Sequence, residues 1–378
     1  MPLAPHRLLD DLRFLGSLAA SNLGGPRLPF KLTLILTYRC QLRCSMCSIW
    51  EREPEGELSK EEIRTFFRRN PSLRWINVSG GEIFLRPDIE EVLVSILEEC
   101  RGLALLDFPT NGYQTRRILE TVDALLRRRP RRLLVTVSVD GPRAVHDRIR
   151  GIEGSYDHAI ETFGRLRTRR RRGFRPFLGL TLQPQNVDLV DTTIEAVRKE
   201  IPDFSPDELH VNLLHISRHY YGNETSERAD RASLEKALAR VRELRPFSLH
   251  PVALLEKLYH RHALTWLETG RTPLPCHALA SSVFVDSWGN VRPCSIYDAP
   301  LGSLRDHDLS LEKLYDATRA REMAREIRQG KCPQCWTPCE AYQTILGNLL
   351  PRPFRRKSAA SVPSCEAASR TLAPGPRG

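Results

Sequence analysis

A regular alternation of apolar strand patterns with helical patterns constrains the fold of this chain more than any other feature. Six nearly continuous hydrophobic runs read as strands: 31–37, 74–80, 103–110, 132–140, 177–183 and 208–214. Helical patterns lie between them at 59–70, 87–100, 114–128, 155–172 and 187–200. Buried strands joined by helices predict an α/β fold with a parallel sheet and right-handed crossovers.

Small and polar residues gather where these strands end. Three cysteines follow the first strand, SGGE (Ser79–Glu82) ends the second, TNG (110–112) ends the third, and SVDG lies within the fourth. Parallel sheets bind ligands at the carboxyl ends of their strands. We therefore expect the functional site at that edge, in a domain over residues 30–214.

The rest of the chain is expected to form four further segments. At 378 residues the chain is long for one hydrophobic core. The patterns predict an amphipathic helix in 1–29, a polar insert with linking helices in 215–270, a cysteine-rich domain in 271–366 and a disordered tail in 367–378. Within the insert, helices are expected near 231–244 and 252–268.

Hydropathy and charge argue against several classes of protein. No apolar run of about 18 residues occurs, so we expect no membrane span. Asp10 and Asp11 interrupt the N-terminal leucines, unlike a secretory signal, which favours a cytoplasmic protein. The net charge of +11 includes arginine runs at 127–132 and 167–175, but both fall at expected helix ends. No RNA-reading motif accompanies them, so nucleic acid is not an expected partner.

The cysteines Cys40, Cys44 and Cys47 form the most specific motif of the chain. In a large chain without an export signal, clustered thiols indicate metal ligands rather than disulfides. A structural zinc site takes four ligands, and no fourth cysteine or histidine lies within the following 50 residues. Three thiolates can instead hold a [4Fe-4S] cluster and leave one iron open to a non-protein ligand.

The pattern Cys40-x3-Cys44-x2-Cys47, with Tyr38 close by, resembles the signature of the radical S-adenosylmethionine (SAM) enzymes. The resemblance implies a partial (β/α)6 barrel whose open iron binds SAM. It also implies that the reduced cluster cleaves SAM to a 5′-deoxyadenosyl radical, which takes hydrogen from a substrate carbon. A donor such as flavodoxin or ferredoxin is then the implied source of electrons.

Further stretches resemble the same family and imply SAM contacts. SGGE corresponds to the family's glycine-rich stretch, which implies a role for Gly80, Gly81 and Glu82. Glycine suits this position because a side chain would block the close approach of a ligand, and a plain strand-to-helix turn is the structural alternative for the two glycines. TNG and the stretch 138–163 are also similar to the family. By this resemblance Ser138 and Arg150 are candidates for the ribose or carboxylate of SAM, and Asn186 for the neighbourhood of its adenosine. A strand-end role for Ser138 and a carboxylate partner for Arg150 are the structural alternatives.

A second group of cysteines lies near the C-terminus. The stretch from Cys276 to Cys294 reads as a β-hairpin with its turn at Trp288–Gly289–Asn290, because glycine and asparagine suit positive φ angles. Four thiols in two pairs also suit zinc. The Cys-x12-Gly-x4-Cys form instead resembles the SPASM or twitch domains, which hold auxiliary [4Fe-4S] clusters. The remaining candidate ligands are Cys332, Cys335, Cys339 and Cys365.

Two ligand sets remain open for this auxiliary site. The twitch arrangement implies one cluster on Cys276, Cys294, Cys332 and Cys335, whereas Cys332, Cys335, Cys339 and Cys365 are also chemically sufficient. A full SPASM domain carries seven cysteines, and this segment has six, so a second auxiliary cluster is in doubt.

The resemblance implies a SAM-consuming oxidoreductase whose auxiliary cluster accepts an electron from the substrate radical. The first strand begins at about residue 31, which leaves no room for an N-terminal peptide-recognition domain. We therefore expect a small-molecule substrate, with maturation of a ribosomal peptide as the alternative. His215, His219, Tyr220 and Tyr221 form a candidate substrate loop, and a solvated loop with buried aromatic residues is the structural alternative. A zinc-stabilised nucleic-acid-binding protein is the alternative from another class, but it assigns no role to Cys40 or to SGGE.

Overall fold

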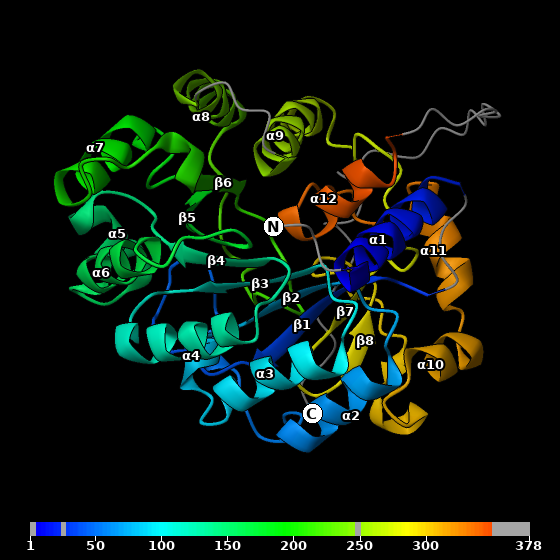
Figure 1. The fold of residues 1–378 in the computed structure, drawn as a ribbon. Coiled ribbons are helices and arrows are strands. Elements are labelled where there is room, and N and C mark those ends of the chain that lie inside the picture. Colours follow the sequence, from blue (N-terminus) through cyan, green and yellow to red (C-terminus); the bar gives the residue numbers. More distant parts are fainter. Residues whose placement is uncertain (1–4, 24–27, 246–250, 350–378) are drawn as a thin grey trace, which may run out of the picture.

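Six parallel strands in sequence order form the centre of the molecule (Figure 1). The computed structural model describes residues 5–23, 28–245 and 251–349, with side chains described from residue 12 onward. The strands are β1 (Lys31–Thr37), β2 (Trp75–Gly80), β3 (Leu105–Thr110), β4 (Leu133–Ser138), β5 (Phe174–Leu182) and β6 (Leu209–Leu213). Each strand pairs in parallel with the next, so the predicted α/β fold with its parallel sheet is confirmed.

Helices cross over between these strands, as the apolar periodicity predicts. They are α2 (Lys60–Arg69), α3 (Ile89–Glu99), α4 (Thr115–Arg127), α6 (Ser155–Arg167) and α7 (Val190–Glu200). Four short 3-10 turns supplement them: η1 (Ile49–Glu51), η2 (Ile83–Leu85), η3 (Pro206–Glu208) and η4 (Arg305–His307). In Figure 1 the crossover helices lie along the outside of the sheet, which leaves its other face to enclose a cavity.

One short helix was not predicted from the sequence. Helix α5 (Arg143–Arg150) follows β4, and only His146 and Ile149 of its eight residues are buried. So short and charged a segment lacks the apolar periodicity on which the prediction of a helix depends. The helix ends at Gly151, which has a φ of 73°.

The C-terminal hairpin extends the same sheet. Strands β7 (Ser282–Val285) and β8 (Asn290–Arg292) form the predicted hairpin, and Gly289 in its turn has a φ of +87°. β7 also pairs in parallel with β1, while β8 pairs with the short β9 (Gly302–Ser303). The cysteine-rich segment is therefore joined to the barrel through backbone hydrogen bonds along β1.

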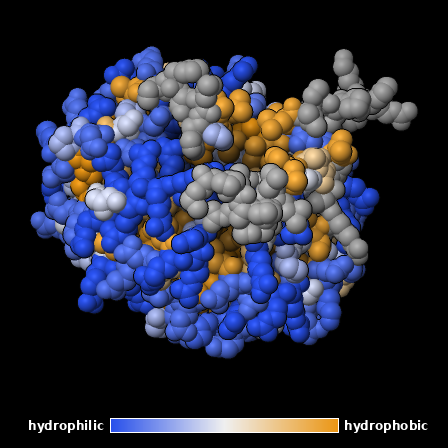
Figure 2. All heavy atoms as spheres, viewed as in Figure 1, coloured by the Kyte–Doolittle hydropathy of each residue, from blue (hydrophilic) through white to orange (hydrophobic). Residues whose placement is uncertain are grey.

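Six further helices complete the described part of the fold. They are α1 (Pro5–Leu23), α8 (Arg231–Leu244), α9 (Pro251–Thr269), α10 (Leu311–Ala317), α11 (Ala320–Arg328) and α12 (Pro338–Leu346). None of the described helices is long and apolar enough to cross a membrane. On the face shown in Figure 2, apolar side chains gather over α9 and α12. The expected tail over 367–378 lies outside the described residues.

A buried polar network fastens α12 to the sheet. Lys31 on β1 is 1% exposed, and its Nζ donates to Gln343 Oε1 at 2.8 Å and to the carbonyl oxygen of Cys339. Ser282 on β7 donates to Glu340 Oε2 at 2.5 Å. Burial raises the pKa of Glu340 to about 7. Since unpaired buried polar groups are costly, these contacts hold the first turn of α12 over the amino-terminal half of β1.

Candidate functional site

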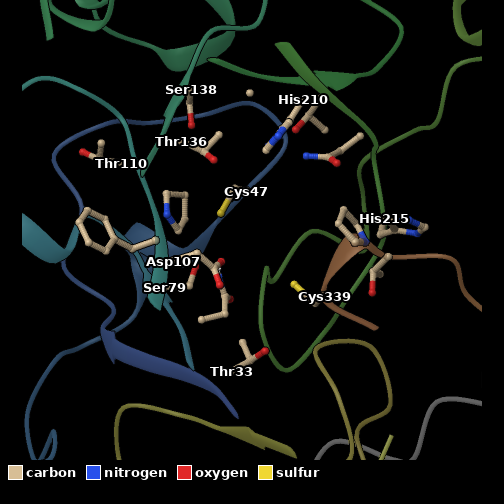
Figure 3. A pocket seen from close by; sticks show the side chains of 18 of the residues that line it. Thr33, Cys47, Ser79, Asp107, Thr110, Thr136, Ser138, His210, His215 and Cys339 are labelled. Carbon is tan, nitrogen blue, oxygen red and sulfur yellow. Dashed lines mark hydrogen bonds between the residues drawn. The ribbon is translucent and has the colours of Figure 1, made fainter. Parts of the chain in front are cut away.

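A cavity of about 410 Å³ lies inside the barrel (Figure 3). The loop after β1, the ends of β2 to β4, strand β6 and the helices α9 and α12 all contribute to its lining. Cys40, Cys44 and Cys47 face this space from one side, and Cys339 of α12 from another. The cavity therefore collects the polar residues that the sequence placed at the strand ends.

The cysteine loop is held by two elements on either side. The amide nitrogens of Arg43 and Ser45 donate to the carbonyl oxygens of Arg150 and Ile149, at 3.0 and 2.8 Å. On the other side the amide nitrogen of Gly81 donates to the carbonyl oxygen of Thr37 at 2.8 Å. The end of β2 and the last turn of α5 thus fix the backbone between Cys40 and Cys47.

Gly80 and Gly81 line the cavity, and their lack of a side chain allows this close packing. A Cβ on Gly80 would overlap the carbonyl oxygen of Thr37, and a Cβ on Gly81 would overlap that of Arg39. The sequence suggested that glycine is needed for the approach of a ligand. The structure adds a second reason, because Gly80 lets the end of β1 and Gly81 lets the cysteine loop lie directly on the end of β2.

Burial shapes the electrostatics of the three thiols. It raises the pKa of Cys40 and of Cys47 to about 12. Burial also raises the pKa of Cys44, although the guanidinium of Arg150 opposes this effect. Thiolates are the form that binds iron, so positive charge from bound iron is what would ionise this loop.

Arg150 lies at the edge of the cavity beside the cysteine loop. Its Nη2 forms an ion pair of 2.5 Å with Asp140 Oδ2, and its Nη1 lies 3.8 Å from Cys44 Sγ. Asp140 is fully buried and also accepts from the amide nitrogen of Thr181 at 3.0 Å. The carboxylate partner that the sequence left as an alternative is thus present, and Arg150 still lines the cavity.

Glu82 and Asn186 are buried and form contacts within the protein. Glu82 accepts from the Thr110 hydroxyl at 3.0 Å and from the Asn111 amide nitrogen at 2.7 Å, and burial raises its pKa to about 7. Asn186 Nδ2 donates to the carbonyl oxygens of Asp140 and Thr181, at 2.9 Å each. Both side chains therefore fix strand-end loops, whereas Ser138 lines the cavity itself.

Sequence reasoning missed a set of polar residues inside the strands. Asp107, Thr136, His210 and Asn212 line the cavity, together with Asn77 and Thr181. His210 Nε2 and Asn212 Oδ1 are buried without a hydrogen-bond partner among the described residues. Polar residues two positions apart in apolar strands, such as His210 and Asn212, were the available signal, because alternate strand residues face the same side.

The loop after β6 connects the two cysteine groups. His215, Tyr220 and Tyr221 line the cavity, as expected for a candidate substrate loop. The carbonyl oxygen of Tyr221 accepts from the amide nitrogen of Ser48 at 2.8 Å. His219 turns away, and its Nε2 lies 3.1 Å from the carbonyl oxygen of Cys294. One loop therefore touches both the triad and the hairpin.

Cys335 lies within electrostatic reach of three other C-terminal cysteines, Cys276, Cys294 and Cys332. Burial raises the pKa of Cys276 and of Cys294 well above the usual range, and the nearby Cys335 and Glu340 contribute to both shifts. The negative charge of a Cys332 thiolate also raises the pKa of Cys276 and of Cys335. Within the described residues no three histidine, cysteine, aspartate or glutamate side chains meet as they would around a single metal ion. Cys365 lies outside the described part of the chain.

The residues present fit the iron-sulfur clusters and SAM. Three buried thiols on one loop face a cavity that continues past them along Gly80, Gly81 and Ser138. A second, separate group of four thiols lies at Cys276, Cys294, Cys332 and Cys335. Each group has the thiolate donors that a [4Fe-4S] cluster requires.

Two protein families match this chain. The radical SAM superfamily matches residues 34–197, and the iron-sulfur cluster-binding domain called SPASM matches residues 276–340. The fold and both cysteine groups thus define an iron-sulfur enzyme that uses SAM. Residues 34–197 of this chain thus form a radical SAM domain, and residues 276–340 form a C-terminal SPASM domain. The first domain binds a [4Fe-4S] cluster and SAM, and the second binds auxiliary iron-sulfur clusters.

The individual proteins that are similar to this chain match it over only part of its length. The subtilosin biosynthesis protein AlbA of Bacillus subtilis is 31% identical over 144 residues, which cover 36% of this chain and 30% of that protein. Pre-heme d1 synthase of Dinoroseobacter shibae is 26% identical over 274 residues, or 67% of this chain and 61% of that protein. The matched segments thus span less than two thirds of either relative.

A solved structure has the same fold over most of the chain. SuiB of Streptococcus suis, bound to S-adenosylmethionine, matches with a TM-score of 0.55 at 14% identity, covering 83% of this chain and 72% of SuiB. A further structure shows SuiB bound to the precursor peptide SuiA. At this identity the likeness establishes the fold.

Proposed function

We propose that this protein is a radical SAM maturase that modifies a ribosomal peptide. The observation that carries the proposal is the likeness to SuiB, which extends over 83% of this chain and therefore well beyond the radical SAM domain. SuiB binds a precursor peptide, and AlbA takes part in the biosynthesis of a bacteriocin. These relatives favour the peptide alternative over the small molecule that the sequence suggested.

Each part of the chain has a role in this proposal. Cys40, Cys44 and Cys47 hold the cleaving cluster, and Gly80, Gly81, Ser138 and Arg150 surround SAM. When bound there, the reduced cluster and SAM together supply a radical that takes hydrogen from a carbon. Glu82 and Asn186 keep the loops after β2 and β5 in place through the hydrogen bonds described above.

The inner wall of the barrel is the proposed substrate site. Asp107 accepts from Trp75 Nε1 at 2.7 Å and from Asn77 Nδ2, so its carboxylate is held in place inside the cavity. His210 and Asn212 offer buried polar atoms without protein partners. Such atoms are suited to the amide groups of a peptide backbone, because every buried donor and acceptor needs a partner.

The C-terminal thiols complete the proposed enzyme. Cys276, Cys294, Cys332 and Cys335 hold one auxiliary cluster, which exchanges single electrons with the reaction site. A soluble donor of the flavodoxin or ferredoxin class supplies the electrons for SAM cleavage. The hydrogen bond between His219 and the carbonyl oxygen of Cys294 connects this proposed auxiliary site to the loop whose Tyr220 and Tyr221 line the cavity.

A transfer of deuterium from the substrate tests the peptide proposal. Bacteria grown on deuterated amino acids supply a labelled extract, which is separated by size into a peptide fraction and a metabolite fraction. Each fraction is incubated anaerobically with the reconstituted enzyme, SAM and a reductant, and the 5′-deoxyadenosine is analysed by mass spectrometry. Deuterium that comes from the peptide fraction and disappears after protease treatment supports a peptide substrate.

A small-molecule substrate is the second candidate function. The observation in its favour is the match to pre-heme d1 synthase, which covers 67% of this chain. If the substrate is a small molecule, the deuterium in 5′-deoxyadenosine should come from the metabolite fraction alone in the same experiment. That result would contradict the peptide proposal.

A further inference from the structure

One thiol of the cavity lies apart from both proposed clusters. Cys339 occupies the first turn of α12, where its carbonyl oxygen accepts from Lys31 Nζ. Figure 3 shows it among the lining side chains together with Cys47 and Thr33. Of the five C-terminal cysteines that the structure describes, Cys339 is the one that lines the cavity.

Cys339 and the cysteine triad face one common space. Tyr220 and Tyr221 line the cavity and are within electrostatic reach of both Cys47 and Cys339. Tyr220 Oη also lies 2.9 Å from Oγ of Ser79, at the end of β2. The free thiol on α12 is therefore positioned across the cavity from the loop that would hold the cleaving cluster.

Two buried polar atoms indicate that a ligand fills this space. Thr33 Oγ1 and Asn111 Nδ2 line the same cavity and have no hydrogen-bond partner among the described residues. Thr33 is 1% exposed and Asn111 is 8% exposed. Buried polar groups in folded proteins are nearly always paired, so these atoms are suited to partners on a bound molecule. Cys339 thus borders a place for substrate.

We propose that Cys339 is a catalytic residue that donates a hydrogen atom to carbon-centred radicals formed in this cavity. The inference rests on the radical chemistry of the proposed function and adds the step that ends it. The S–H bond of a thiol is weaker than most C–H bonds, so transfer from sulfur to a carbon radical is favourable. A structural role for Cys339 would require no such transfer.

The proposed step balances in atoms and electrons. The substrate carbon forms a C–H bond, the Cys339 S–H bond breaks, and a thiyl radical remains on Sγ. One electron from a donor of the flavodoxin or ferredoxin class and one proton from solvent then restore the thiol. The substrate keeps its number of hydrogens, and the configuration of the attacked carbon can invert. This outcome differs from the net oxidation that the sequence suggested.

Deuterium from solvent provides a test that requires no substrate. The holoenzyme is incubated in D2O with SAM and dithionite only, and the 5′-deoxyadenosine is analysed by mass spectrometry. The Cys339 thiol exchanges to S–D, so the wild type is expected to place a single solvent deuterium in 5′-deoxyadenosine. Cys339→Ser should lose this label while still cleaving SAM, because a serine O–H bond is too strong to give up its hydrogen.

Cys100→Ser is the matched control. Cys100 is also a buried cysteine, at 1% exposure, but it follows α3 outside the cavity lining. This variant should keep the label. An unchanged deuterium label in Cys339→Ser, with SAM cleavage intact, would overturn the proposal. The proposal would also fail if Tyr221→Phe, and not Cys339→Ser, lost the label.

A second measurement separates the proposed role from a ligand role. Wild-type holoenzyme is treated with iodoacetamide, and the alkylated cysteines are mapped by mass spectrometry before and after removal of iron. A free Cys339 should react before iron is removed, whereas Cys335 should react only afterwards. Protection of both would make Cys339 a cluster ligand. Because no peptide is used, failure here is distinguishable from failure of the peptide proposal.

Discussion

At the scale of single residues, Arg150 links the cysteine loop to the rest of the barrel. Its backbone carbonyl binds the amide of Arg43, while its side chain pairs with Asp140 and approaches Cys44. The resemblance assigned Arg150 to SAM but could not identify Asp140 as its partner, because that pairing depends on how α5 packs against the strand ends. The buried pair therefore suggests that Arg150 also supports the loop.

We predict that Arg150→Met impairs cluster binding as well as SAM cleavage. Removal of one partner from a buried ion pair leaves Asp140 unpaired, which typically costs about 3–5 kcal/mol. Anaerobic iron analysis and SAM cleavage assays should both show a loss. Arg148→Met is the control, since Arg148 is exposed on the same helix, and it should behave as the wild type. Normal iron content in Arg150→Met would confine the role of Arg150 to SAM.

His260 on α9 is predicted to make stability depend on pH. It is fully buried, its Nε2 donates to the carbonyl oxygen of Val211 at 3.0 Å, and burial lowers its pKa to about 4. In the unfolded chain a histidine has a pKa of about 6.5, so between these values the unfolded state binds the extra proton. The free energy of unfolding should therefore fall as the pH is lowered from about 6.5 towards 4.

The measurement for His260 is denaturant unfolding of the holoenzyme at several pH values. His260→Gln should reduce the slope of stability against pH, because the glutamine does not titrate. His158→Gln, at a half-buried position on α6, should leave more of the slope intact. Equal slopes for the wild type and His260→Gln would contradict the prediction.

At the scale of elements, the end of β2 determines where the cysteine loop lies. Sequence reasoning recognised the glycines of SGGE as part of a ligand site but attributed them to the approach of the ligand alone. The structure shows that the end of β1 occupies the space above Gly80 and that the cysteine loop occupies the space above Gly81. That packing is a contact between segments about 40 residues apart, so no local pattern could reveal it.

We predict that Gly81→Ala loses the cleaving cluster while the overall fold persists. The added methyl group would overlap the carbonyl oxygen of Arg39 next to Cys40 and displace the loop. Iron analysis should show a loss of about four irons, the content of one [4Fe-4S] cluster. Gly16→Ala on α1 has free space around the new methyl group and should keep all its iron. Full iron content in Gly81→Ala would show that the loop tolerates the shift.

At the scale of the whole molecule, the barrel and the C-terminal segment form one sheet of nine strands. The pairing of β7 with β1 and the network around Lys31 bring α12 over the cavity. The C-terminal hairpin and α12 are therefore joined to the barrel that encloses the cavity.

We predict that the two cysteine groups bind iron independently. The wild type should contain about eight irons, and Cys294→Ala about four, because the proposed function assigns one [4Fe-4S] cluster to each group. Cys294→Ala should still cleave SAM without completing the reaction, whereas Cys40→Ala should lose SAM cleavage. Formation of 5′-deoxyadenosine by Cys40→Ala would contradict the assignment of the triad. About twelve irons in the wild type would indicate a second auxiliary cluster.

The sequence by itself determined the order of the elements and the chemistry of the first domain. Hydrophobic periodicity is local, so it placed β1 to β6 and their main crossover helices, and the spacing of three cysteines within one loop is local as well. Only the tertiary structure decided which distant residues meet. It paired Arg150 with Asp140, placed Cys339 but not the other described C-terminal cysteines in the cavity lining, and turned His210 and Asn212 into the cavity. Such contacts depend on how strands and helices pack in three dimensions, which short stretches of sequence do not encode.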